Sequence, residues 1–249
     1  MIKKYKHFFF DLDGTLWDLY KNTEIALRQI CSEFGMLEDD DSFKAFYKSY
    51  HYHNEQVWSL YRVGKIEKSV LRTIRFQKAF DEVGIEMSAE QTENFATRFL
   101  DVCPKLPHLI EGTHELLSFL YPHVKIHIIT NGFKEVQGFK MDAGNLNQYI
   151  TEMINSEDVG KRKPNPEIFE YALKVTGAKV EESLMIGDDW DADIVGARTF
   201  GMDQVFLTNT EIQQATILSK DGEIRLPRHN NSATFTVDKL SDLINILNK

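Results

Sequence analysis

Hydrophobic and polar positions change their spacing twice along this chain. Residues 7–10 (HFFF) form a short aromatic run that stops at an Asp-Gly turn, which is typical of a buried strand. From about residue 22 to residue 101 the apolar positions recur every three or four residues, and no convincing strand is visible. This middle stretch therefore predicts helices only.

Four amphipathic helices with short connections are expected there, as in a helical bundle. Ser88 and Gln91 fit a capping box at the start of the last helix. The second, third and fourth helices are expected at residues 42–60, 67–83 and 88–102. The apolar face of the first helix contains Leu27, Ile30, Cys31 and Phe34.

Beyond Pro104 the pattern alternates between short apolar strands and amphipathic helices. Such alternation predicts an α/β fold with a doubly wound, Rossmann-like parallel sheet. Strands are expected at residues 125–130, 153–155, 184–187, 205–207 and 235–237, and helices at 111–120, 166–175, 194–200 and 240–247. The apolar side of the helix at 166–175 contains Ile168, Phe169, Ala172 and Val175. Residues 209–228 show no clear period.

The all-helical stretch interrupts the α/β pattern directly after its first strand. We therefore expect two domains that are not consecutive in the chain. The core domain would consist of residues 1–16 and 104–249, and the inserted helical domain of residues 17–103.

Charge and composition narrow the classes of partner. The 249 residues include 29 Lys and Arg against 38 Asp and Glu, which leaves a formal net charge of −9 without a basic stripe. Nucleic-acid polymers are therefore not expected as partners, because they bind through cations that contact phosphates. Two cysteines are too few for a disulfide framework, and no run approaches the ~18–20 apolar residues of a membrane span. We expect a cytoplasmic protein without a membrane partner, and the oligomeric state stays open.

Polar side chains follow four of the predicted strands. Asp11 and Asp13 come after the first strand, and Thr130 and Asn131 come after the second. Lys163 lies on the loop after the weak strand at 153–155. Because ligands of such sheets bind beyond the carboxyl ends of the strands, we expect these groups at one edge. The strand at 184–187 is followed by four further carboxylates, Asp188, Asp189, Asp191 and Asp193.

Clustered carboxylates raise one another's pKa unless a cation holds them together, and oxygen-only ligands suit Mg²⁺. One aspartate can attack phosphorus to form an aspartyl-phosphate, and a second can protonate the leaving oxygen and later activate water. A dianionic phosphate that faces three carboxylates meets a repulsion on the order of 10–20 kcal/mol. Mg²⁺ and a lysine offset this repulsion, and donors at Thr130 and Asn131 can hold a phosphoryl oxygen. Taken singly, each aspartate also fits a turn or a helix cap.

Four motifs, in the same order, resemble those of the haloacid dehalogenase (HAD) superfamily. They are residues 8–16 (FFFDLDGTL), residues 128–132 (IITNG), Lys163-Pro164 within 160–169, and residues 187–193 (GDDWDAD). The resemblance covers nearly the whole chain. It implies a HAD-like core, a hydrolase of the phosphatase type and a small phosphomonoester as substrate.

The resemblance also implies roles for individual residues. Asp11 would be the nucleophile and Asp13 the general acid/base, while Thr130, Asn131 and Lys163 would hold the phosphoryl group. Mg²⁺ would be bound by Asp11, by Asp13 through its backbone carbonyl, and by Asp188. Asp193 would support the metal or Lys163, and Asp189 is close enough in sequence to reach the metal.

The inserted helices resemble the C1-type cap of one HAD subclass, which closes over the site and selects the substrate. The chain as a whole looks most like the 5′-nucleotidase branch, so nucleoside 5′-monophosphates are the expected substrates. Trp17 and Asp18, at the entry to the cap, are candidate substrate contacts. An aromatic and histidine-rich stretch at residues 47–62 could stack on a nucleobase, although its spacing also fits the core of the bundle.

Four other functions stay open. A phosphoglycolate or sugar-phosphate phosphatase and a phosphomutase would use the same apparatus. A 2-haloacid dehalogenase needs neither a metal nor the acid at Asp13. A phosphorylatable switch also combines aspartate, Mg²⁺, threonine and lysine, but a cap and Asp13 would shorten the life of its acyl-phosphate.

Overall fold

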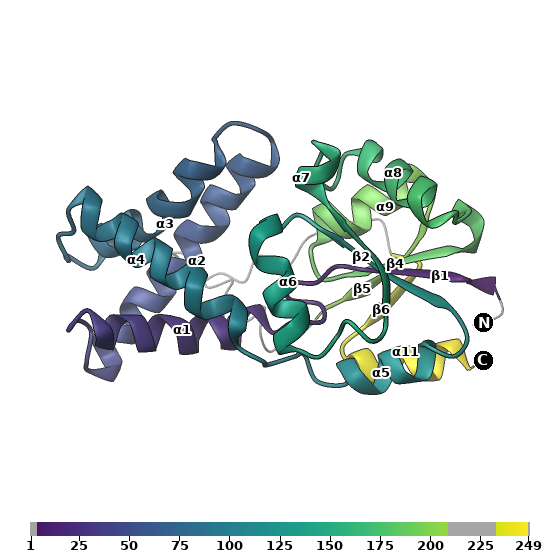
Figure 1. Cartoon of the computed structure of the whole chain (residues 1–249), viewed down its shortest axis with the longest axis horizontal. Coiled ribbons are helices and arrows are strands. Elements are labelled where there is room, and N and C mark those ends of the chain that lie inside the picture. Colours follow the sequence, from purple (N-terminus) through teal and green to yellow (C-terminus); the bar gives the residue numbers. More distant parts are fainter. Residues whose placement is uncertain (1–3, 209–232, 249) are drawn as a thin grey trace. The chain divides into compact units, whose positions relative to one another are not determined.

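The computed structural model describes residues 4–208 and 233–248, and the stretch expected to lack a period, 209–228, lies outside them (Figure 1). The described residues form two compact units. The sheet unit contains residues 4–19, 107–208 and 233–248, and the helical unit contains residues 20–106. No helix in these described ranges has the length and apolar character required to cross a bilayer.

A six-stranded, fully parallel sheet is the centre of the sheet unit, in the order β3-β2-β1-β4-β5-β6. The chain passes from β1 outwards through β2 to β3, and then returns to the other side of β1 for β4, β5 and β6. This order confirms the doubly wound sheet and places the switch of direction between β1 and β4. The strands are β1 (His7–Phe10), β2 (Lys125–Thr130), β3 (Ile150–Asn155), β4 (Ser183–Gly187), β5 (Asp203–Leu207) and β6 (Phe235–Val237).

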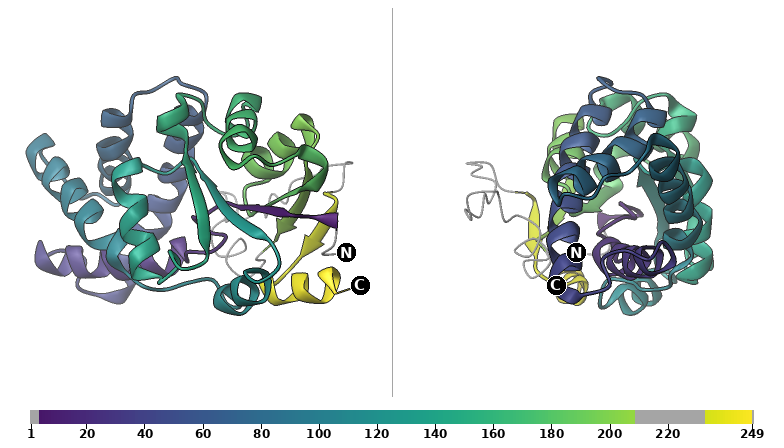
Figure 2. Two further views of the ribbon diagram at one scale, coloured as in Figure 1. Left: turned by 45° about the vertical axis from the view of Figure 1, so that its right-hand side comes forward. Right: turned by 90° about the vertical axis from the view of Figure 1, so that its left-hand side faces the viewer.

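Helices cover both faces of this sheet because its central strands are apolar on both sides. α8 and α9 pack on one face, where Ile168 and Ala197 join Phe9, Ile129 and Met185 in a buried cluster. α5 and α11 lie side by side on the other face (Figure 1 and Figure 2). The helices of this unit are α5 (Thr113–Leu120), α6 (Lys134–Ala143), α7 (Ser156–Val159), α8 (Pro166–Thr176), α9 (Gly196–Phe200) and α11 (Leu240–Leu247). Shorter turns are η3 (Val180–Glu182) and η4 (Trp190–Val195), which is a π-helix.

The helical unit consists of four helices around an aromatic core. The ring of Phe46 stacks on Phe80 at 4.5 Å between centroids, and Phe95 meets Phe80 edge-on at 5.0 Å. The predicted capping box is present, since Gln91 donates its backbone N–H to Ser88 and accepts from the backbone N–H of Ser88. The elements are α1 (Leu19–Glu33, which begins at the last residue of the sheet unit), α2 (Asp40–Arg62), α3 (Lys68–Glu82), α4 (Ala89–Val102) and the short η2 (Cys103–Lys105).

Three local predictions were wrong or incomplete. Helix α6 was not predicted, because its polar residues hide the helical period of its few apolar ones. The helix expected at 194–200 begins four residues earlier, as the π-helix η4. Val175 is exposed rather than buried, since the packed face of α8 consists of Ile168, Phe169 and Ala172 with Leu173 beside them.

Candidate active site

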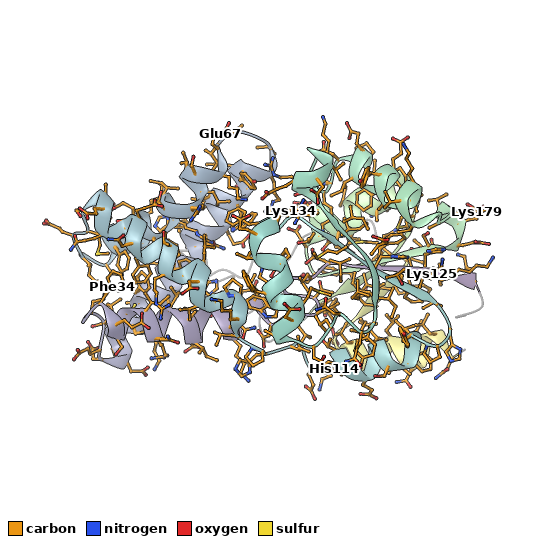
Figure 3. The ribbon with its side chains drawn as sticks, viewed as in Figure 1. Phe34, Glu67, His114, Lys125, Lys134 and Lys179 are labelled. Carbon is orange, nitrogen blue, oxygen red and sulfur yellow. The ribbon has the colours of Figure 1, made fainter. Side chains whose placement is uncertain are left out.

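The polar groups predicted to gather do so at the carboxyl ends of β1, β2 and β4, in the sheet unit. The labels Lys125 and Lys134 in Figure 3 mark the first residues of β2 and α6, and the site lies at the end of β2 that leads to Lys134. Asp11 continues β1, since its backbone N–H donates to Ile186 of β4 at 2.9 Å. The chain turns away from the sheet directly afterwards, so the Asp11 side chain stands at the sheet edge.

Lys163 is the central cation of the site and is almost fully buried. Its Nζ lies 2.5 Å from Oδ1 of Asp11 and 2.7 Å from Oδ1 of Asp193, and it donates to the backbone oxygen of Ile129 at 2.7 Å. Burial by itself lowers the pKa of Lys163, but the charges of Asp11 and Asp193 outweigh burial and raise it. The ammonium group therefore stays charged and joins the loop after β3 to the ends of β1 and β2.

Asp11, Asp188 and Asp193 form a cluster in which one carboxylate oxygen of each lies within 4.8 Å of the others. Burial and the neighbouring charges of Asp11 and Asp193 raise the pKa of Asp188 well above its usual range. Burial also raises the pKa of Asp11, and raises that of Asp193 to about 7 although Lys163 opposes it. Three carboxylates carry more negative charge than the single ammonium group of Lys163 can neutralise, so the cluster favours a further cation. Carboxylate oxygens at this spacing fit a hard divalent cation.

Two glycines let the backbone approach these carboxylates. At Gly14, where φ is +86°, an added Cβ would lie 2.4 Å from Oδ2 of Asp188. At Gly187 it would lie 2.1 Å from Oδ2 of Asp193. Both distances are far below contact, so any larger residue would displace a carboxylate of the cluster. The glycines of the first and fourth motifs are thus explained by the space that the site requires.

Asn131 connects the second motif to the loop that carries Lys163. Its Nδ2 donates to the backbone oxygen of Lys163 at 3.0 Å, and its Oδ1 accepts from the backbone N–H of Lys163 at 2.9 Å. These paired hydrogen bonds position the lysine at the site. The contact of Asn131 with a phosphoryl group stays a prediction.

Thr130 and Asp13 are linked through helix α6. Gln137 donates from Nε2 to Oγ1 of Thr130 at 2.5 Å and to Oδ2 of Asp13 at 3.0 Å. Lys140 donates from Nζ to Oδ1 of Asp13 at 2.6 Å. The sequence interpretation missed both residues because α6 itself was missed. The available signal was a pair of polar residues, Gln137 and Lys140, that stand three apart in the segment after the TNG motif. This pattern resembles any solvated helix face.

The remaining candidates lie around this centre. Trp17 is fully buried, and Nζ of Lys140 lies 4.7 Å from its ring centroid. Asp18 is half-buried and donates its backbone N–H to His108 at 3.0 Å. Asp189 caps η4 by accepting from two backbone N–H groups, while Asp191 is exposed. Contacts of Trp17 and Asp18 with a substrate, and of Asp189 with a metal, stay predictions.

Comparisons with known proteins indicate the family of this chain. The sequence profile of the haloacid dehalogenase-like hydrolases matches residues 5–201, and that of the HAD-hydrolase-like family matches residues 161–243. The chain is 28% identical to the HAD-hydrolase YfnB of Bacillus subtilis over 99% of this chain and 97% of YfnB. It is 30% identical to the pyrimidine 5′-nucleotidase YjjG of Escherichia coli over 80% of this chain and 84% of YjjG.

Solved structures extend the comparison to the whole fold. A crystal structure of YfnB bound to magnesium superposes with a TM-score of 0.82 at 25% identity, and covers 99% of this chain and 100% of YfnB. The defluorinating L-2-haloacid dehalogenase Rha0230 is similar in fold alone, with a TM-score of 0.76 at 15% identity and coverage of 98% and 96%. The profile match over most of the chain, the parallel sheet and the four motifs converge on one family. This chain is an enzyme that belongs to the haloacid dehalogenase-like hydrolases.

Proposed function

We propose that this hydrolase is a Mg²⁺-dependent phosphomonoesterase that acts through an aspartyl-phosphate on Asp11. The observation that carries the proposal is the arrangement of two buried carboxylates, Asp11 and Asp193, the half-buried Asp188 and the buried Lys163 at the ends of β1 and β4. Asp13 follows two residues after Asp11. Clustered anions of this kind bind an anionic substrate only when cations accompany them.

In the first step the Asp11 carboxylate attacks phosphorus, and the bond between phosphorus and the leaving oxygen breaks. Asp13 gives its proton to that oxygen, so the alcohol leaves neutral. Lys163 and the hydroxyl of Thr130 hold the phosphoryl oxygens as their charge spreads. Thr130 is the last residue of β2, and Nζ of Lys163 donates both to the backbone oxygen of Ile129 in β2 and to Asp11.

In the second step Asp13 takes a proton from water, whose oxygen attacks phosphorus. The bond between phosphorus and Asp11 breaks, so inorganic phosphate leaves and Asp11 returns to its starting form. Mg²⁺, held by Asp11, Asp188 and the carbonyl of Asp13 with Asp193 in support, would neutralise phosphoryl charge in both steps. The magnesium bound to YfnB supports this assignment, as does the oxygen-only cluster.

Nucleoside 5′-monophosphates are the substrates that we propose, with the helical unit as the cap that selects them. The similarity to the pyrimidine 5′-nucleotidase YjjG supports this choice over phosphoglycolate or a sugar phosphate. In the aromatic stretch that could stack on a base or belong to the core, Tyr50 and Tyr61 are buried in the helical unit. The base would therefore be recognised by groups other than these two rings.

A phosphate-release screen tests the proposal. The purified protein is given nucleoside 5′-monophosphates, sugar phosphates and phosphoglycolate, with Mg²⁺ and with excess EDTA. We expect release that needs Mg²⁺, that is lost in Asp11→Asn, and that survives in Asp191→Asn, whose side chain is exposed. Phosphate release by Asp11→Asn would contradict the assigned nucleophile, and a preference for another phosphate would replace the proposed substrate.

The same preparation tests the dehalogenase alternative. Chloride release from 2-chloropropionate that persists in EDTA, without phosphate release from any ester, would overturn the phosphatase proposal. The fold similarity to dehalogenases does not distinguish the two reactions, because both use an aspartate at the end of the first strand. The acidic cluster favours phosphate, since a metal-free attack on carbon has no use for Asp188 beside Asp11.

A further inference from the structure

Helix α6 presents two polar side chains to Asp13 from one face. Gln137 is fully buried and Lys140 is nine-tenths buried, and they stand three residues apart, so both lie on the same side of the helix. Gln137 holds one carboxylate oxygen of Asp13 and Lys140 holds the other. The carboxyl group therefore cannot rotate without breaking a hydrogen bond.

Gln137 is buried in an orientation that the site imposes. Both N–H bonds of its amide are used, one toward Thr130 and one toward Asp13, while its Oε1 has no hydrogen-bond partner among the described residues. A flipped amide would bring Oε1 against a carboxylate oxygen of Asp13, which is repulsive. A buried carbonyl oxygen without a partner destabilises a protein. The amide therefore directs both donors to Thr130 and Asp13, although this orientation leaves Oε1 without a partner among the described residues.

Those donors determine where the hydroxyl of Thr130 points. Oγ1 of Thr130 accepts from the backbone N–H of Gly132 at 3.0 Å as well as from Gln137. A hydroxyl oxygen has two lone pairs, so both are occupied and its hydrogen must donate elsewhere. Gly132 makes the arrangement possible, because an added Cβ there would lie 2.0 Å from Nε2 of Gln137.

Lys140 completes the support of Asp13. Its ammonium group lies 2.6 Å from the carboxylate and 4.7 Å from the ring centroid of Trp17, which is fully buried. The lysine is thus held by a carboxylate and an aromatic face at once. When Asp13 carries a proton on one oxygen, the other oxygen can still accept from Lys140.

We propose that Gln137 and Lys140 are positioning residues, which hold the proton-transferring carboxyl group of Asp13 and the phosphoryl-binding hydroxyl of Thr130 in one fixed relation. This inference rests on the proposed phosphatase function. Its consequence is that protonation of the leaving oxygen and binding of the phosphoryl group are aligned before the substrate arrives. A displacement of the Asp13 carboxyl group by about an ångström would weaken protonation of the leaving oxygen and leave binding of the phosphoryl group nearly intact.

Leaving-group dependence tests the proposal. Wild type, Gln137→Met and Lys140→Met are compared with a nucleoside 5′-monophosphate, whose alkoxide needs a proton, and with p-nitrophenyl phosphate, whose phenolate does not. The quantity compared is kcat/KM, which reports only the first step, because Asp13 is also the base of the second step for both substrates. We expect kcat/KM for the nucleotide to fall by about 10- to 100-fold in each variant, as for a misplaced acid. For p-nitrophenyl phosphate we expect less than about a threefold change in kcat/KM in Lys140→Met. In Gln137→Met, which also releases the hydroxyl of Thr130, the loss with p-nitrophenyl phosphate should be smaller than the loss with the nucleotide. Lys140→Arg should restore most of the nucleotide activity.

The controls separate position from stability. Lys134→Met removes an exposed lysine of the same helix and should leave both rates unchanged. Gln137→Met removes the lone Oε1 together with two hydrogen bonds, so the two effects on stability oppose each other and its melting temperature should stay close to that of wild type while its nucleotide kcat/KM falls. Equal losses with both substrates, or no loss with either, would overturn the positioning role. A wild type that releases no phosphate from either compound would overturn the proposed function and this inference with it.

Discussion

Replacing Lys163 by methionine removes the only ammonium group in contact with the buried carboxylates Asp11 and Asp193 among the described residues. At an effective dielectric of 20, two unit charges 2.5–2.7 Å apart attract by roughly 6 kcal/mol. Two such pairs offset the penalty of burying three charged groups. Removal of one partner of a buried ion pair destabilises proteins by about 3–5 kcal/mol, because the other charge stays buried and uncompensated.

The backbone oxygen of Ile129 also loses its lysine donor, which adds about 1 kcal/mol or more. We therefore expect Lys163→Met to lower the free energy of unfolding of the sheet unit by about 4–6 kcal/mol. Urea unfolding at neutral pH measures it, with tryptophan fluorescence as the signal because Trp17 and Trp190 both belong to the sheet unit.

Lys161→Met is the matched control, since Lys161 lies two residues earlier, is exposed and pairs with Glu167 at 3.5 Å. Its effect should stay within about 0.5 kcal/mol. A loss below 1 kcal/mol in Lys163→Met would refute the reasoning, because it would mean that the carboxylate cluster is stable without its cation.

Three further outcomes are expected. Gly187→Ala should abolish activity and lower the free energy of unfolding by about 1–3 kcal/mol, because its Cβ would meet Asp193. Gly138→Ala, in open space on α6, should raise the free energy of unfolding by up to about 1 kcal/mol. Urea titrations measure the two stabilities, and the phosphate assay measures the activity. Burial lowers the pKa of His51 to about 4, below its unfolded value of 6.5. Between these two pH values the unfolded state binds one more proton than the folded state, so the free energy of unfolding falls as pH drops from about 6.5 to about 4. His51→Gln should reduce this slope by up to about 1.4 kcal/mol per pH unit in unfolding experiments, and an unchanged slope would contradict the burial. Ser88→Ala should cost about 1 kcal/mol of stability by removing the capping box, measurable by thermal unfolding.

Elements with a strong local signal were predicted well. The strand at residues 125–130 has the predicted bounds, and the helix that begins at Pro166 starts where the sequence places it. The capping box at Ser88 was predicted from four residues. These features depend on side chains that act within one or two turns of their own backbone, so the local sequence contains the necessary information.

Predictions failed where a local pattern was weak or where packing decided the result. Helix α6 has few apolar residues, and its polar face looks solvated although Gln137 is fully buried. The burial of Gln137 follows from its contacts with Thr130 and Asp13, and Asp13 is 124 residues away in sequence. No periodicity argument contains such a contact.

The order of strands and helices, the interruption after β1 and the positions of the aspartates at strand ends were determined by the sequence itself. Hydrophobic period and turn chemistry are local, and they specify which residues leave a strand at its carboxyl end. Only the tertiary structure decided which charges meet there. Lys163 pairs with Asp11 across 152 residues, and Lys140 with Asp13 across 127, because the parallel sheet brings the ends of distant strands and their loops together. Burial at that edge then determines which carboxylates have raised pKa values and which cation holds them, since desolvation and Coulomb energy depend on position in space and not on spacing along the chain.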